Sequence, residues 1–186
     1  MADLKSLKLT TASDAGIGGD LTGITDNATE AAIVISSDEE VTMPLQPAFL
    51  AYASAMDNNV TGTATITTVG FDTEVFDQGG DFASNTFTAP VTGRYLLSAA
   101  VRYNGATVAC VTENITIITS NRNYVSYKSR TFSAHDGNVC NATAVTDMDA
   151  GDTATVTLAL GGEASDLVDI QGSAGAATRF SGCLLA

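Results

Sequence analysis

The chain has 186 residues, of which 21 are Asp or Glu and only 8 are Lys or Arg, so its formal net charge is -13. A surface this acidic repels nucleic-acid phosphates and anionic lipids, and we therefore expect neither DNA, RNA nor a membrane surface as a partner. No apolar run approaches the roughly 20 residues of a membrane-spanning helix, and the first residues lack the apolar stretch of a secretory signal.

Residues 1–45 are predicted to form an N-terminal stem, separate from the domain that follows. Within it, two short strands are predicted at 32–36 and 41–44, with a turn between them. This part resembles the small-strand linkers of bacteriophage fibre proteins, of the form I-x-I-S-S-D-G-x-V-T-M-P, although Glu39 and Glu40 stand where Gly and Asn are usual. Glycine does not recur at every third position, so the chain has no collagen helix with which to form a trimer.

The clearest strand pattern spans residues 87–103. A short strand begins at Phe87, and Pro90 ends it, because proline has no amide donor and a fixed φ. Gly93 then relieves the corner that leads into a long strand. One face of that strand carries only uncharged side chains, namely Tyr95, Leu97, Ala99, Val101 and Tyr103. This period of two is typical of a half-buried strand.

From residue 47 onward, strands recur about every ten residues with turns between them, as in a β-sandwich. Besides those already named, strands are predicted at 64–69, 113–117, 124–133, 153–160 and 180–184. The segment at 124–133 is mostly polar, with Val125 and Tyr127 on one face and Phe132 on the other. We expect this strand to be solvated or to lie at an interface.

Four segments carry a family resemblance, in the same order and with similar spacing. They are Pro47-Ala48-Phe49-Leu50-Ala51, the run from Phe87 through Ala89-Pro90 and Gly93 to Tyr95, the weaker match Met148–Val156, and Phe180-Ser181-Gly182-Cys183-Leu184-Leu185. Together they cover residues 47–186. They resemble the globular head of complement component C-one-q and its tumour-necrosis-factor-like relatives.

The resemblance implies an all-β fold, an antiparallel jelly-roll β-sandwich of about ten strands. It places the head at residues 46–186 and implies that three copies form a trimer. It also implies which residues form the fold signature and the trimer core: Phe49, Phe87, Pro90, Gly93, Tyr95, Phe180, Gly182 and Leu184.

Few residues in the sequence could take part in catalysis or disulfide bonding. The three cysteines, Cys110, Cys140 and Cys183, are an odd number in a chain without a secretory signal, which indicates free thiols. A bridge between Cys110 and Cys140 stays open, and Cys183 is expected to be a small buried side chain. His135 has no nucleophile and no orienting group near it in the sequence, so we expect an exposed loop residue and no enzyme.

Two acidic turns are candidates for a calcium site, because spaced carboxylates can surround a hard cation. Asp77 and Asp81 flank one of them, and some relatives of the resembled family bind calcium. The turn at 147–152 lacks the glycine and the glutamate that a helix-loop-helix calcium loop has at its sixth and twelfth places. A simple turn is favoured in both places, and no other cofactor is expected.

These observations favour a structural protein of a bacteriophage particle. It would be a trimeric capsid decoration or head-fibre protein on the virion surface, assembled in the host cytoplasm, with residues 1–45 bound to capsid or tail proteins. The alternative is the receptor-binding tip of a short tail fibre, or a surface adhesin, which recognises a host glycan or protein through loops such as 104–107 and 120–123. The position on capsid or tail stays open.

Overall fold

The computed structural model describes residues 33–35, 38, 40–129 and 137–186. The stem prediction for residues 1–32 and the prediction for His135 lie outside them. The described residues form fifteen strands and no helix. About ten strands were expected for a jelly roll, and the excess consists of short strands of two or three residues. None of these residues forms a helix long and apolar enough to cross a membrane.

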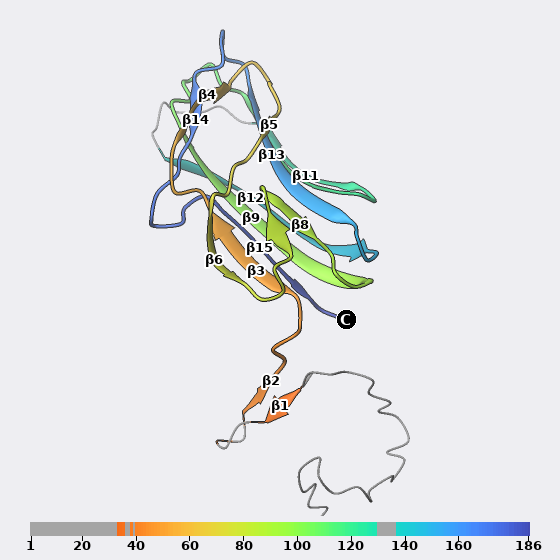
Figure 1. Cartoon of the computed structure of the whole chain (residues 1–186). Coiled ribbons are helices and arrows are strands. Elements are labelled where there is room, and N and C mark those ends of the chain that lie inside the picture. Colours follow the sequence, from red (N-terminus) through yellow and green to blue (C-terminus); the bar gives the residue numbers. More distant parts are fainter. Residues whose placement is uncertain (1–32, 36–37, 39, 130–136) are drawn as a thin grey trace, which may run out of the picture. The chain divides into compact units, whose positions relative to one another are not determined.

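Two antiparallel sheets face each other (Figure 1). The seven-stranded sheet has the order β4-β14-β9-β15-β3-β6, with β12 also paired to β9. Its strands are β3 (Ala48–Tyr52), β4 (Asp57–Thr61), β6 (Thr73–Asp77), β9 (Gly93–Asn104), β12 (Asn138–Met148), β14 (Val168–Ile170) and β15 (Arg179–Leu184). The expected antiparallel β-sandwich is confirmed.

The six-stranded sheet has the order β11-β10-β13-β8-β7, with β5 also paired to β13. Its strands are β5 (Thr67–Thr68), β7 (Phe82–Ala83), β8 (Thr86–Thr88), β10 (Thr112–Thr119), β11 (Asn123–Ser129) and β13 (Thr153–Gly161). A separate hairpin precedes the sandwich, formed by β1 (Val34–Ile35) and β2 (Val41–Thr42). This hairpin is the strand-turn-strand unit that the linker-like segment predicts.

Strand β9 is the centre of the seven-stranded sheet, because it pairs with β12 along its first eleven residues and with β15 on its other side. The alternation predicted for it is confirmed. Tyr95, Leu97, Val101 and Tyr103 are each 0% exposed, and Ala99 is 2% exposed. The polar strand at β11 is also as expected, since Val125 and Tyr127 are more than half exposed. Phe132 lies outside the described residues.

The motif residues meet in one aromatic cluster between the two sheets. The ring of Phe49 lies 4.7 Å from that of Phe87 and 5.0 Å from those of Phe82 and Phe180. Tyr95 adds an edge contact to Phe87 at 5.4 Å, and its hydroxyl donates a hydrogen bond to the Val91 carbonyl at 2.7 Å. Aromatic pairs at such distances stabilise a core beyond their area alone, by about 0.5–1.5 kcal/mol each. The large signature residues therefore build the core of the single chain.

Glycine is needed at two signature positions because other chain segments pass close to them. A Cβ at Gly182 would lie 2.6 Å from Leu97 Cδ2 and 2.7 Å from Phe49 Cε1. At Gly93 it would lie 2.6 Å from Leu184 Cδ1 and 2.8 Å from the Ala186 carbonyl oxygen. Gly93 is not among the glycines with positive φ, so a strained corner is not the reason for it.

Two local expectations are wrong. Only Thr67–Thr68 of the segment 64–69 is a strand, and Ile66 is 73% exposed. In the preceding turn, the Thr63 amide and the Thr65 hydroxyl donate hydrogen bonds to the Asp166 carboxylate, at 2.8 and 2.6 Å. The other error concerns Cys183, which is only half-buried, because it lies on the outward face of β15.

Replacing Gly182 by valine is expected to lower the free energy of unfolding by roughly 1–3 kcal/mol, because the added carbons overpack the space between Phe49 and Leu97. Chemical denaturation at a fixed protein concentration measures the loss. The matched control is Gly70→Val, since a Cβ at Gly70 meets nothing within 4 Å. Equal losses in the two variants would contradict the packing explanation.

Candidate functional site

The main candidate for a functional surface is the outward face of the seven-stranded sheet. The strand registers align the outward side chains in rows across the sheet, and three adjacent rows lie between one row with Arg94 and Asp147 and another with Arg102 and Val139. We call these rows the uncharged face; they consist of Val145, Leu96, Cys183 and Ala48, then Thr143, Ser98, Ser181, Leu50 and Phe76, then Asn141, Ala100, Arg179 and Tyr52. Arg179 is its single charged member.

The middle row shows the character of this face. Ser98 and Ser181 lie in its centre and are half-buried. The hydroxyls of Ser98 and Thr143 are 3.0 Å apart and hydrogen-bonded, and Phe76 at the end of the row is 48% exposed. Charged side chains are scarce in these three rows although the chain has a net charge of -13. Depletion of charge is what marks the centre of a protein–protein interface.

The three cysteines are free thiols, as expected, and they differ sharply in access. Cys110 and Cys140 are fully buried in the core. Burial raises the pKa of the Cys140 thiol to about 12, and burial also raises the pKa of Cys110. Since the thiolate is the reactive form, both are inert at neutral pH. Cys183 in the uncharged face is half-buried and is the accessible thiol.

A buried carboxylate joins the two sheets at one end of the sandwich. Glu113 is 1% exposed and accepts hydrogen bonds from the Tyr103 hydroxyl at 2.5 Å and from the Lys128 ammonium at 2.9 Å. Its donors come from β9 and β11, so both sheets hold the charge. The strand period places Glu113 on the core side with Ile115 and Ile117, but no sequence pattern links it to its partners, which lie 10 and 15 residues away on other strands. These contacts support a structural role.

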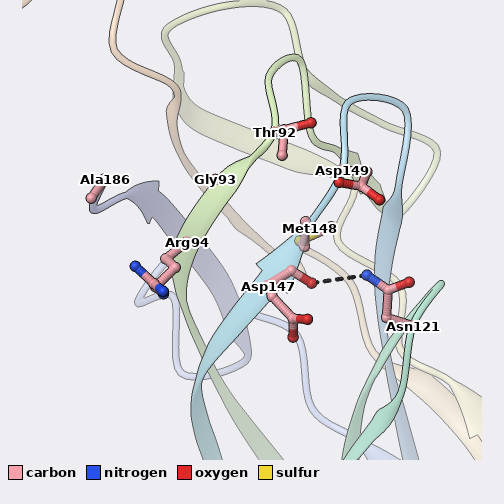
Figure 2. Close-up of a pocket in the computed structure, with 8 residues that line it drawn as sticks. All are labelled: Thr92, Gly93, Arg94, Asn121, Asp147, Met148, Asp149 and Ala186. Atoms are coloured by element: carbon pink, nitrogen blue, oxygen red, sulfur yellow. Dashed lines mark hydrogen bonds between the residues drawn. The ribbon is translucent and has the colours of Figure 1, made fainter.

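A polar hollow of about 260 Å³ lies where β9 begins and β12 ends. Figure 2 shows Asn121 reaching across it to the backbone carbonyl of Asp147, at 3.0 Å. Asn121 also donates to the Asp152 carboxylate at 2.8 Å, and Arg122 pairs with Asp147 at 3.3 Å. The Arg94 guanidinium points away from this group in the same view. The polar groups of the hollow thus hold its turns together.

The acidic turn at Asp77 and Asp81 is held by hydrogen bonds within the chain. The Asp77 carboxylate accepts hydrogen bonds from the backbone amides of Asp81 and Phe82, at 3.0 and 2.9 Å. Burial, with a smaller effect of Asp77, raises the pKa of Asp81. Within the part of the chain that the structure describes, no three His, Cys, Asp or Glu residues are grouped so that they could hold a metal ion. The Asp77 oxygens are thus engaged with backbone amides, and the calcium candidate at Asp77 and Asp81 stays a prediction.

The two loops predicted to bind a host molecule lie at opposite ends of the sandwich. Loop 120–123 borders the polar hollow near Gly93, where β9 begins. Loop 104–107 follows the last residue of β9, and Thr107 there is hydrogen-bonded to the Glu163 carboxylate. Twelve strand residues separate the two ends, which corresponds to roughly 35 Å. They cannot form one binding surface in a single chain.

Comparisons with known proteins agree with this architecture. No protein-family model and no curated protein matches the chain. Crystal structures of murine APRIL at pH 5.0 and pH 8.0 match it with TM-scores of 0.51 and 0.52, at 15% and 16% identity, over 75% of this chain and 99% of theirs. The fold is an antiparallel jelly roll like that of these structures. The globular domain of the zebrafish complement 1qA protein is also similar, with a TM-score of 0.47 and 17% identity over 76% of this chain and 98% of its own.

This jelly roll confirms the fold that the four sequence segments imply. The matches cover three quarters of the chain, and the bounds 46–186 of the head stay a prediction. At such low identity the similarity shows the fold and nothing about activity. The expectation that the chain is not an enzyme stays a prediction.

Replacing Tyr103 by phenylalanine is expected to lower the free energy of unfolding by about 1–3 kcal/mol, because it removes a donor from a buried carboxylate. Thermal or chemical unfolding measures the loss. Tyr127→Phe is the control, since Tyr127 is 59% exposed and surface changes usually stay within about 0.5 kcal/mol. An unchanged stability in Tyr103→Phe would show that the inter-sheet bond contributes nothing.

Proposed function

We propose that this chain is a structural protein of a bacteriophage particle, which assembles through its uncharged face into a trimer and displays the jelly-roll head on the virion surface. The observation that carries the proposal is the uncharged face itself. Its three rows hold thirteen side chains and one charge, that of Arg179, on a chain with 21 acidic residues, and the charges of Arg94, Asp147 and Arg102 lie in the flanking rows.

The charge of the chain supports contact between copies through this face. Two copies with a net charge of -13 each repel one another wherever their acidic surfaces approach. Contact through the uncharged face keeps the carboxylates at the rim, where solvent screens them. Half-exposed Val145 and Phe76, on opposite margins of the face, supply apolar area to bury.

The number of copies and the place on the particle follow from sequence resemblances. The signature segments resemble a family whose heads form trimers, so we propose three copies. The β1–β2 hairpin has the strand pattern of bacteriophage fibre linkers, and it precedes the head as a linker would. We propose that residues 1–45 bind capsid or tail proteins. Capsid decoration is favoured, because an acidic head suits a position away from packaged DNA.

A receptor-binding tip or adhesin is the alternative. The polar hollow supports it, because Asn121, Asp147 and Asp149 offer hydrogen-bonding groups beside loop 120–123. A glycan would be recognised by groups of this kind. The hydrogen bonds that already occupy Asn121 weigh against it.

Replacing Ser181 by aspartate is expected to dissociate the trimer, because it places a carboxylate of every copy in the middle of the contact. Like charges facing each other in an interface cost several kcal/mol, which corresponds to a loss of affinity of about 100-fold or more. Native mass spectrometry or light scattering over a dilution series measures the change. The control is Thr155→Asp, on the outward face of the other sheet.

Cys183 gives a second measurement with the unmodified protein. In the trimer its thiol is covered, so alkylation at neutral pH should be slow, and it should become fast in Ser181→Asp. Cys110 and Cys140 stay unreactive in both because they are buried. A wild-type protein that is monomeric, or that alkylates at Cys183 as fast as the variant, would overturn assembly through the uncharged face.

Removing residues 1–45 is expected to leave a folded head that no longer binds to particles, because the attachment segment is gone. Cryo-electron microscopy of particles with and without this segment measures the occupancy and shows the location. Density on the shell supports decoration, whereas density at the tail supports host recognition. A truncated head that still decorates capsids would contradict the attachment role of residues 1–45.

A further inference from the structure

The two sheets meet along one open side of the sandwich, between strands β11 and β12. β11 is paired only with β10 and β12 only with β9, so both strands are edges of their sheets. At one end of this side, the Arg122 guanidinium pairs with Asp147 at 3.3 Å. Farther along, the first half of β11 and the middle of β12 line a shared hollow of about 350 Å³. Moving along β11 toward Lys128 therefore moves back along β12 toward its first residue, Asn138.

Lys128, near the end of β11, holds its ammonium against the buried carboxylate of Glu113. The Nζ atom is 2.9 Å from Oε1 of Glu113, and Oε2 accepts a hydrogen bond from the Tyr103 hydroxyl at 2.5 Å. A carboxylate at hydrogen-bond distance can take a proton from the ammonium, which leaves a nucleophilic amine. The amine stands on a flexible stem of four carbons, so it can move within this space. The pair thus has the parts of an activated nucleophile.

Asn138 brings a carboxamide to the same end of the sandwich. It is paired in register with Tyr103, and directly opposed residues of neighbouring strands project from the same face of a sheet. Tyr103 is inward and 0% exposed, so the Asn138 side chain is also on the inward face, where it is half-buried. Burial is the main cause of the raised pKa of Cys140, the next inward residue of β12, and the charges of Glu113 and Lys128 also act on it. The inward start of β12 therefore lies beside the Glu113–Lys128 pair.

The other asparagines of β9 to β12 point away from this pair. Asn104, Asn114, Asn123 and Asn141 each lie next to an inward side chain of the same strand. Because successive side chains of a strand alternate between its two faces, these four carboxamides lie on outward faces. Among the described asparagines of these four strands, Asn138 is therefore the one that shares the interior with Lys128.

We propose that Lys128 and Asn138 form an amide cross-link between the two sheets, with Glu113 transferring the protons. Glu113 takes a proton from the Lys128 ammonium, and the freed amine attacks Cγ of Asn138. The Cγ–Nζ bond forms and the Cγ–Nδ2 bond breaks. The two protons that Nζ loses pass through Glu113 to the leaving nitrogen, which departs as ammonium, so no further reactant is consumed. The Lys128 side chain is 43% exposed, which gives the leaving group a path to solvent.

The cross-link fastens the edge of one sheet to the edge of the other, where the salt bridge alone can open. It also closes the connection between residues 128 and 138, which lowers the entropy of the unfolded chain. All the residues involved belong to one chain, so the link is independent of the proposed assembly and of the place on a particle.

The mass of the intact wild-type chain is the first test. It is expected to be lower than the sequence mass by one ammonia, about 17 Da. Lys128→Arg keeps a positive charge beside Glu113 but has no amine to donate, so it should show its full sequence mass. Asn138→Ala should also show its full mass, whereas the matched control Asn141→Ala, on the outward face of the same strand, should lose ammonia as the wild type does.

Peptide mapping after trypsin digestion locates the bond. The peptide that contains Asn138 is expected to be joined to the β11 peptide, with no cleavage after Lys128. Glu113→Gln cannot take the proton and is expected to leave most of the chain unlinked, while circular dichroism checks that it folds.

Three results would contradict the proposal. A folded wild-type chain of full sequence mass overturns it. So does a loss of ammonia that maps to Asn104, because the glycine that follows allows that asparagine to cyclise without a lysine. A folded Glu113→Gln chain that is linked as completely as the wild type overturns the role of Glu113.

Discussion

The structure depends on the packing of Phe49 against aromatic side chains from both sheets. Phe49 and Phe180 come from neighbouring strands of the seven-stranded sheet, and Phe82 and Phe87 come from the short strands of the other. Their close contact leaves room for no side chain at Gly182. The uncharged face exists because the inward side chains of β3 and β15 are fixed in this way, which turns Ser181 and Cys183 outward.

Much of this arrangement is encoded locally and could be predicted. The alternation from Tyr95 to Tyr103 identifies the central strand, since every second residue is apolar over its whole length. The Phe87 and Phe180 segments predict the jelly roll through their resemblance, and the hairpin before the head follows from its short strands and turn. In each case neighbouring residues carry the signal.

Features that depend on partners distant in the sequence could not be predicted. The turn after Thr61 lies where alternation predicts a strand, because Asp166, about a hundred residues away, accepts its hydrogen bonds. Glu113 has the periodicity of a core residue, but only the fold shows that Tyr103 and Lys128 stabilise its charge. The uncharged face combines residues from five separate strands, so no single stretch of sequence reveals it.

The place of β15 in the chain has a consequence for the timing of assembly. It follows every other strand in the described chain, yet it lies between β9 and β3 in the sheet. During translation, β9 and β3 emerge from the ribosome long before the strand that joins them. The aromatic cluster lacks Phe180 until then, and the surface around Ser181 and Cys183 does not yet exist. Under the proposed assembly, nascent chains could not associate through that surface before each has completed its own fold.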